Sequence, residues 1–516
     1  MRSFDPSRLP IHDQLQSVLD ALKAGRDVLL SAPPGAGKST IVPGAVADQE
    51  WCKGKVLISQ PRRLAAQALA RRVAALRGCQ VGQDVGYAVR FDRQISAATR
   101  LEFLTAGLLL RRLQNDPFLD GIDCVILDEF HERSLDTDFC LALLMQIRAE
   151  ARPDLRVIVM SATLDTTTLA DRLPKAAHIV SKGRSFPVSV EHQKSSDQPI
   201  DKRAAQAAAR ALKETGRVLV FLPGVRSIQR CQEALRDCQV TVLPLHGRLS
   251  QAEQQLALDP CSEPQIILAT NIAETSLTID GVHTVIDSGL ARTPRYDGKL
   301  GLSRLTTVPI SRASADQRAG RAGRLGPGRC IRLWSSASEH QRPAFDTPEI
   351  VDAELSSSLL NILVWGQRLD QFAWFEEPPA THRRQAIHLL HQLGAIDEHE
   401  MITSKGRTLA QLPINPRLGA VLYHGALCGA IDLACTVAAL ASEPDFLRHR
   451  PPTHWGDDLS YRIEQLEAPN GAIDNSARQR ILKVVKQLKQ LAPKLGPSVD
   501  QPKHLLQHLL LAGFAD

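Results

Sequence analysis

The chain has 516 residues, of which 43% are hydrophobic and 23% charged. This length exceeds what one ordinary core can hold, so we expect three to four domains, and the hydrophobic share is enough to fill their interiors. The net charge of +6 is mildly basic, which is compatible with a nucleic-acid partner. The ten cysteines include no C-x-x-C pair, and no apolar run approaches the roughly 20 residues that cross a bilayer. We therefore predict a soluble cytoplasmic protein without a zinc site, a disulfide framework or a membrane span.

Short apolar runs dominate the first 160 residues, and each is followed by a polar or glycine-rich segment. They lie at residues 28–30, 56–58, 124–127 and 157–160. Such runs predict buried parallel strands in βα units. The polar segments would then follow the C-terminal ends of the strands, which is where open α/β sheets bind ligands.

A second series of apolar runs occurs at residues 218–221, 266–269, 282–286 and 330–333. It predicts a second α/β domain, joined to the first by a linker at 184–199 that contains Pro187 and Pro199. From about residue 345 the apolar spacing becomes helical. Residues 386–393 form one such helix, closed by Gly394, and residues 421–440 form a further apolar helical region.

The segment at 32–39, APPGAGKS, fits a Walker A phosphate loop in which alanine replaces the usual first glycine. Lys38 would supply a charge to the β and γ phosphates of ATP, and the Ser39 hydroxyl would bind Mg²⁺. A glycine-rich surface turn is the alternative, which the preceding strand and following helix disfavour. The predicted nucleotide-binding residues of the loop are Gly35, Ala36, Gly37, Lys38, Ser39 and Thr40.

An acidic box, Asp-Glu-Phe-His, follows the third apolar run at residues 128–131. Asp128 has the position of a Walker B aspartate that holds Mg²⁺, and Glu129 can orient or deprotonate an attacking water. Two solvated carboxylates on a loop are the alternative. Because that alternative is uncommon directly after a buried strand, the box favours hydrolysis of ATP by water.

The segment QRAGRAGR at 317–324 places three arginines around two glycines. Arg321 and Arg324 are candidates for an arginine finger that stabilises the charge on the γ phosphate, and Gln317 is a candidate to hold the water. The alternative is a basic helix that contacts RNA. Since the segment belongs to the second α/β half, ATP would lie between the two halves.

Further motifs occur in a fixed order at residues 60–63, 105–107, 161–163, 221–224, 269–281 and 317–324. Together with the phosphate loop and the box, they resemble the DEAH-box helicases of superfamily 2. The run DEFHERSL at 128–135 is most similar to the bacterial HrpB type within that family. The resemblance covers about residues 15 to 340.

The resemblance implies an α/β fold with RecA-like domains at 1–185 and 186–344, then a winged helix at 345–415 and a ratchet-like helical domain at 416–516. It implies ATP and Mg²⁺ as cofactors, and 3′-to-5′ movement on single-stranded RNA with duplex unwinding or RNP remodelling. A β-hairpin near 292–309 would help to separate strands, unless it is an ordinary surface hairpin. HrpB-like proteins usually continue into further domains, so we expect this chain to be a fragment or a shorter variant.

The resemblance also implies roles for individual residues. His131 would link the nucleotide site to Gln317 and to the motif at 161–163, in which Ser161 and Thr163 would couple hydrolysis to strand movement. Arg72 would stack on the adenine, and Asp280 would lie at the nucleotide. Leu258 occupies the position of the second stacking residue, which predicts loose selectivity for the base.

Nucleic acid would be held through its backbone, because the candidate contacts are arginines, hydroxyls, amides and glycine. We predict contacts from Arg62, Arg90, Thr105, Gly224, Thr270 and Asn271. The expected partner is single-stranded RNA, bound by a monomer and with no role for a membrane. Two alternatives stay open: a DNA translocase on the same engine, and a nucleotide-gated clamp that does not unwind.

Overall fold

The structure is a computed structural model in which two compact units can be distinguished. The sheet unit holds residues 1–297, 303–353 and 374–377, and the helical unit holds residues 298–302, 354–373 and 378–516. The structure describes residues 9–90, 92–162, 166–182, 186–194, 196–213, 216–261, 263–274, 279–297, 302–324, 326–449, 451, 457–469, 473–495 and 504–515.

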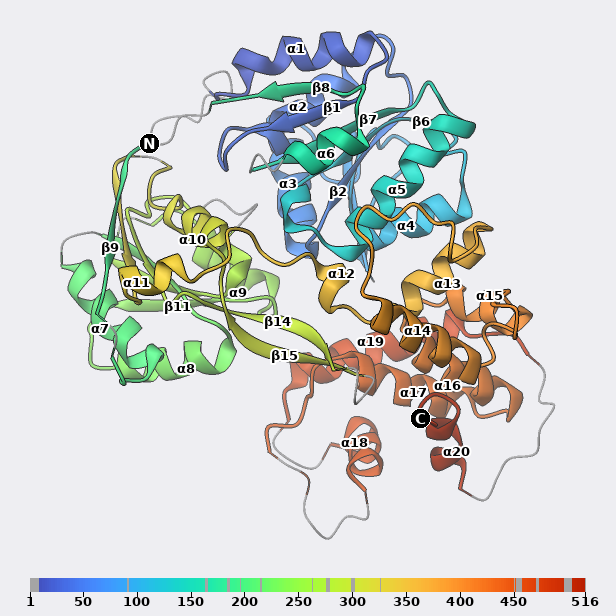
Figure 1. Cartoon of the computed structure of the whole chain (residues 1–516). Coiled ribbons are helices and arrows are strands. Elements are labelled where there is room, and N and C mark those ends of the chain that lie inside the picture. Colours follow the sequence, from blue (N-terminus) through green and yellow to red (C-terminus); the bar gives the residue numbers. More distant parts are fainter. Residues whose placement is uncertain are drawn as a thin grey trace. The chain divides into compact units, whose positions relative to one another are not determined.

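The first sheet of the sheet unit has eight strands, and the four predicted runs form its centre (Figure 1). All neighbouring strands are parallel except the pair β4 and β3. The strands are, in spatial order, β4 (Asp92–Gln94), β3 (Val85–Val89), β5 (Leu101–Thr105), β2 (Lys55–Gln60), β6 (Ile122–Leu127), β7 (Arg156–Ser161), β1 (Val28–Ser31) and β8 (Ala177–Val180). The predicted parallel α/β architecture is confirmed for this half.

Helices accompany these strands, as βα units require. They are α1 (His12–Lys23), α2 (Lys38–Ala47), α3 (Arg63–Leu76), α4 (Ala106–Asn115), α5 (Leu135–Glu150) and α6 (Thr166–Arg172). Buried side chains of α1, α2 and α3 share one apolar cluster with the strands of the sheet. This packing fixes the ends of the strands, on which the polar motifs lie.

The second sheet has six parallel strands and is also confirmed as predicted. Their order is β11 (Thr241–Leu245), β12 (Gln265–Ala269), β10 (Arg217–Phe221), β13 (Thr284–Asp287), β16 (Gly328–Arg332) and β9 (Val188–His192). The helices of this half are α7 (Ile200–Leu212), α8 (Val225–Ala234), α9 (Gln251–Leu258), α10 (Arg312–Ala319), α11 (Ser336–His340) and α12 (Glu349–Asp352). Alternate strand residues fill two apolar clusters.

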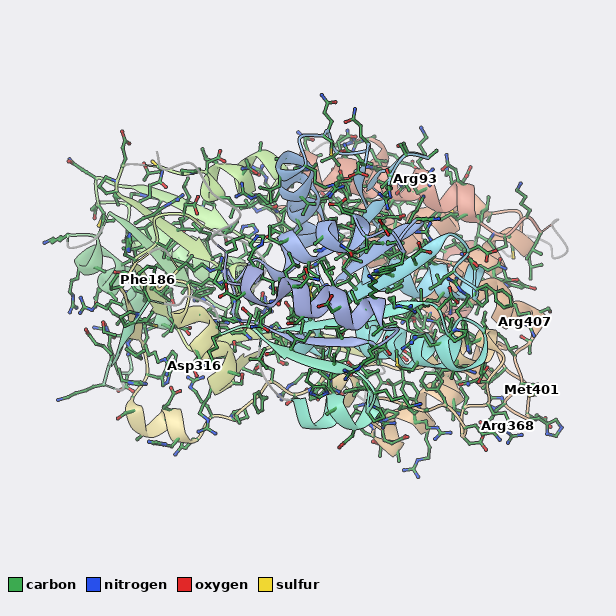
Figure 2. The ribbon with its side chains drawn as sticks, turned by 90° about the horizontal axis from the view of Figure 1, so that it is seen from above. Arg93, Phe186, Asp316, Arg368, Met401 and Arg407 are labelled. Atoms are coloured by element: carbon green, nitrogen blue, oxygen red, sulfur yellow. The ribbon has the colours of Figure 1, made fainter. Side chains whose placement is uncertain are left out.

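The predicted linker at 184–199 is wrong in part, because it contains β9. This strand pairs in parallel with β16 at the edge of the second sheet. Phe186, labelled in Figure 2, lies just before it, is 43% exposed and donates its N–H to the carbonyl of Gly323 at 3.0 Å. The sequence pattern does not indicate this strand, because four of its five side chains are exposed and it therefore contains no apolar run.

Strands β14 (Leu290–Asp297) and β15 (Leu302–Pro309) form a separate two-stranded sheet, which is the hairpin expected near 292–309. The residues between them, 298–301, lie outside the described residues. At the base of the hairpin, the side chain of Arg292 passes Gly224, where the Cδ atom lies 2.9 Å from the position that a Cβ would take. A larger residue at 224 would therefore displace this arginine.

The helical unit contains helices and two isolated antiparallel bridges, which join Ile396 to Ile402 and Leu447 to Ile473. The helices are α13 (Ser356–Trp365), α14 (Ala380–Gln392), α15 (Ser404–Gln411), α16 (Pro416–Leu427), α17 (Ile431–Ser442), α18 (Asp458–Glu467), α19 (Asn475–Leu491) and α20 (Leu505–Leu511). Gly394 follows α14 with φ +65°, so the predicted helix end is confirmed. The helical region expected at 421–440 is divided between α16 and α17, because Gly429 turns the chain with φ +66°. No described helix is long and apolar enough to cross a membrane.

Candidate nucleotide site

The phosphate loop connects β1 to α2. Gly35 and Gly37 have φ +87° and +95°, a region that only glycine adopts without strain. A Cβ at Gly37 would also lie 2.8 Å from Leu9. Gly37 caps α2 without a side-chain bond, and the Thr40 hydroxyl donates to the Gly37 carbonyl at 3.1 Å. The N-terminal end of α2 thus follows directly on a glycine-rich loop, an arrangement that commonly binds phosphate.

Asp128 lies directly after β6 and is 1% exposed. Its carboxylate accepts hydrogen bonds from the Gln60 side chain at 2.7 Å and from the Glu129 N–H at 2.8 Å, and it also bonds with the side chain of Ser39. Burial and the charge of Glu129 raise the pKa of Asp128. A carboxylate beside a hydroxyl from the phosphate loop is an oxygen donor set of the kind that Mg²⁺ prefers.

Glu129 is buried and forms an ion pair with Lys38, with 3.2 Å between its Oε2 atom and the lysine Nζ. Burial raises the pKa of Glu129, but the charge and hydrogen bond of Lys38, with smaller effects of Arg321 and of His131 in its protonated form, lower the pKa overall. Its backbone has φ +51°, which is unusual for a residue with a side chain. An ionised carboxylate is thus held next to the lysine that is predicted to bind phosphate.

His131 belongs to the single turn Phe130–Glu132 that follows Glu129. Its Nδ1 atom accepts the N–H of Ala162 at 3.1 Å, next to the end of β7. Burial lowers the pKa of His131 to about 4, so the imidazole is neutral at pH 7. The box thus contacts the motif at 161–163, whereas no hydrogen bond joins His131 to Gln317 within the described residues. Ser161 is buried at the end of β7, and Thr163 lies outside the described residues.

The three arginines of the 317–324 segment have different surroundings. Arg318 lies on α10 and is 1% exposed. It bonds to Glu274 and to Asp287, each at 2.9 Å, and lies over the ring of Phe221 at 4.9 Å. These partners all belong to the second sheet and its helices, so Arg318 stabilises the fold of this half.

Arg321 and Arg324 are turned toward the first sheet's site. Arg321 donates from its Nε atom to the carbonyl of Glu274 at 3.0 Å, and its charge acts on Glu129. The Nε atom of Arg324 lies 3.9 Å from the position that a Cβ on Gly35 would take. Burial lowers the pKa of Arg324 to about 10, while the charges of Glu129 and Asp280 oppose that effect. Both guanidinium groups are therefore near the phosphate loop and Glu129.

The residues expected at the adenine are less well organised. Arg72 lies exposed on α3, and Leu258 at the end of α9 packs against the apolar cluster of the second sheet. The side chain of Asp280 is exposed, while its carbonyl accepts a bond from Arg217 at 2.5 Å. This leaves the expectation of loose base selectivity as a prediction.

The residues expected to contact nucleic acid follow strand ends in both sheets. Arg62 follows β2 and donates to the carbonyl of Asn271 at 2.5 Å, while Glu132 accepts from its Nε at 3.1 Å. The others also come directly after strands or begin the next helix: Arg90 after β3, Thr105 at the end of β5, Gly224 at the start of α8 and Thr270 after β12. In each sheet these residues therefore share the edge that carries the nucleotide motifs.

Two buried side chains of the site were not assigned a role from the sequence. Gln60 is fully buried and holds Asp128, and Glu274 accepts from Arg318 and from the Ser314 hydroxyl at 2.6 Å. Each lies within a motif, and Gln60 ends an otherwise apolar strand. A polar residue at the last position of a buried strand was the signal that could have identified Gln60.

Three family models match the chain. A DEAD/DEAH box helicase model matches residues 12–171, a helicase conserved C-terminal domain model matches 203–326, and a helicase associated domain (HA2) winged-helix model matches 386–414. These matches fall on the first sheet, the second sheet and the start of the helical unit.

Individual relatives agree with these models. The chain is 40% identical over 488 residues to the ATP-dependent RNA helicase HrpB of Escherichia coli, covering 91% of this chain and 60% of the relative. It is 36% identical over 463 residues to the ATP-dependent RNA helicase HrpA of the same organism, covering 86% of this chain and 36% of the relative. The crystal structure of the Escherichia coli DEAH/RHA helicase HrpB is similar with a TM-score of 0.86 and 38% identity, over 98% of this chain and 63% of that one. The chain thus spans about three fifths of the length of HrpB.

Proposed function

The chain belongs to the DEAD/DEAH-box helicases, and on that premise we propose that it is an ATP-dependent RNA helicase. It would couple ATP hydrolysis to 3′-to-5′ movement on single-stranded RNA and to duplex unwinding or RNP remodelling, as a cytoplasmic monomer. One observation carries the proposal. Lys38, Asp128 and Glu129 of the first sheet are grouped together, and Arg321 and Arg324 of the second sheet face them.

In the proposed reaction, the γ phosphate of ATP enters the phosphate loop and takes over Lys38 from Glu129. Asp128 and Ser39 would hold Mg²⁺, which neutralises phosphate charge when it is bound. Water then attacks the γ phosphorus while the bond to the ADP oxygen breaks. The carboxylate of Glu129 accepts a proton from that water as the new bond forms, and its basicity rises when Lys38 leaves it. Arg321 and Arg324 stabilise the charge of the loose transition state.

The roles of the remaining residues follow from the same proposal. Gln317 would help to position the water, and Arg72 and Asp280 would lie at the rest of the nucleotide. Ser161 and Thr163 would transmit hydrolysis to the grip on RNA. Support comes from the contact between His131 and Ala162, which connects the acidic box to the motif at 161–163.

RNA would be held by groups that bind the sugar-phosphate backbone. In the described arrangement Arg62 is engaged with Asn271, a residue on the other sheet that is expected to bind RNA too. RNA binding would therefore replace this contact, and the grip would depend on the state of both sheets. Such backbone contacts carry no sequence information, so affinity should fall steeply with salt.

The test compares ATP hydrolysis by the purified chain with matched single strands of RNA and DNA. We expect RNA to stimulate hydrolysis more than DNA, and equal or greater stimulation by DNA would favour the DNA translocase. Lys38→Ala should lower turnover by about 10²-fold or more through lost phosphate contact. Glu129→Gln should keep ATP binding, measured with a fluorescent analogue, and block hydrolysis. Full activity in the Lys38 variant would overturn the site assignment.

Unwinding is tested separately with RNA duplexes that carry a single-stranded tail on one side. Displacement that requires a 3′ tail and ATP is the expected result. Turnover of ATP with no displacement from any duplex would favour the nucleotide-gated clamp. The Glu129→Gln variant is the matched control, because it should bind the same duplex without displacing a strand.

A further inference from the structure

A short piece of the C-terminal half of the chain lies within the sheet unit. The chain leaves this unit after Ala353, forms α13 in the helical unit and then contributes Trp374–Glu377 to the sheet unit before α14 begins. Phe375 is 6% exposed and Trp374 is 3% exposed, so both rings are buried. Phe375 packs on the acidic box, and Trp374 packs on α5, the helix that follows the box.

Phe375 packs against the box itself. Its ring meets the ring of Phe130 edge to face, with 5.4 Å between centroids and 75° between planes. The guanidinium of Arg133 lies over the ring of Phe375, 4.4 Å from its centroid. Arg133 also pairs with Glu376 and with Asp138 on α5, each at 2.9 Å. Phe375, Arg133 and Glu376 together form what we call the latch.

Two further contacts support the chain that follows the acidic box. Trp374 packs on Phe139 of α5 with 6.2 Å between ring centroids. Glu349, on α12, donates its N–H to the carbonyl of Arg133 at 3.1 Å and accepts the N–H of Leu135 at 2.9 Å. The turn after Glu129 and the start of α5 are therefore held by two segments that follow the second sheet in sequence, α12 and residues 374–377.

The backbone of this turn needs external support. Glu129 and Arg133, which stand immediately before and after the turn, have φ +51° and +48°. Backbone in this region costs on the order of 1–3 kcal/mol for each non-glycine residue, and it persists only where the surroundings determine it. Phe130 belongs to this turn, is 1% exposed and packs directly on Phe375, so it connects the latch to the turn.

We propose that Phe375 is a positioning residue for ATP hydrolysis: through Phe130 and Arg133 it holds the turn that orients Glu129 and His131. This inference rests on the proposed hydrolysis at Glu129. It makes the C-terminal half of the chain part of the machinery that sets the hydrolysis rate, although Phe375 lies outside the nucleotide motifs and acts through Phe130 and Arg133. It also gives the phenylalanine of the box a partner for its ring.

The test measures RNA-stimulated hydrolysis by Phe375→Ala in the full chain. We expect kcat to fall about tenfold, as for a small misplacement of a catalytic group, and KM for ATP to change less than about twofold. The melting temperature separates positioning from general damage. Phe372→Ala removes a buried ring three positions earlier in the chain and should lower the melting temperature without lowering kcat, and Phe345→Ala removes an exposed ring and should change neither. An unchanged kcat in Phe375→Ala overturns the inference.

A double-mutant cycle decides whether Phe130 carries the effect. If the two rings act as one unit, Phe130→Ala and Phe375→Ala together lower kcat no further than the stronger single variant. Effects that multiply independently would overturn the proposed route through Phe130. The wild-type chain separates the proposed function from the latch: absence of hydrolysis by the wild-type chain refutes the proposed function, whereas wild-type hydrolysis together with an unchanged kcat in Phe375→Ala refutes the latch alone.

Discussion

The two sheets have the same parallel architecture, yet their strand ends carry opposite charges. At the end of β6, the carboxylates of Asp128 and Glu129 are balanced only in part by Lys38. At the end of the second sheet, the carboxylates of Glu274 and Asp287 are both engaged by Arg318. Arg321 and Arg324 add further positive charge there.

One fold can therefore supply two complementary halves of a site. The first sheet offers a phosphate loop and carboxylates suited to Mg²⁺ and water, and the second offers cations suited to phosphate. In the second sheet Arg318 stabilises the fold, whereas Arg321 and Arg324 interact with the charge of Glu129 in the first sheet. If this division is correct, substitutions within one segment should separate into losses of catalysis and losses of stability.

Arg321→Ala should give the largest effect of this kind. An arginine that stabilises the transferring phosphoryl group is worth about 10³-fold or more in kcat, so we expect a loss of at least that order. RNA affinity, measured by fluorescence anisotropy at fixed salt, should change little. A variant that loses RNA affinity and retains kcat would place Arg321 on the RNA and contradict its assignment to the γ phosphate.

Arg318→Ala should act on stability instead, because it leaves Glu274 and Asp287 buried without their cation. Breaking a buried pair of this type costs about 3–5 kcal/mol in the free energy of unfolding, which urea titration of the sheet unit's transition would measure. Arg329→Ala is the matched control, since its pair with Glu191 at the exposed edge of the same sheet is worth at most about 1 kcal/mol. Equal losses in both variants would contradict the assignment of Arg318 to the fold.

His131 offers a smaller, pH-dependent test of the first sheet's site. Its folded pKa is about 4 and its ordinary pKa is 6.5, so it contributes stability above pH 6.5 that is lost as the pH falls toward 4. Between pH 7 and 4.5 the wild-type chain should lose about 2 kcal/mol more stability than His131→Gln. Parallel pH profiles for the two proteins would show that His131 is not buried in its neutral form.

Local pattern was enough to predict the central strands of both sheets. Apolar runs of three or four residues mark β1, β2, β6, β7, β10 and β12, and the glycines of the phosphate loop follow from the positive φ that such a loop needs. The edge strand β9 was missed because burial on both faces, which produces an apolar run, is absent at an edge. The division between α16 and α17 was missed because the apolar spacing continues across Gly429.

Residue type and spacing identify the groups that the site has available: a lysine in a phosphate loop, an Asp-Glu pair after a buried strand and a cluster of arginines. The partners of these groups follow from the tertiary structure. It paired Arg318 with Glu274 and Asp287, brought Arg324 to Gly35, and set Phe375 against Phe130. Charge pairing and ring packing between residues tens to hundreds of positions apart leave no trace in local periodicity, because they depend on which strand ends the fold brings together.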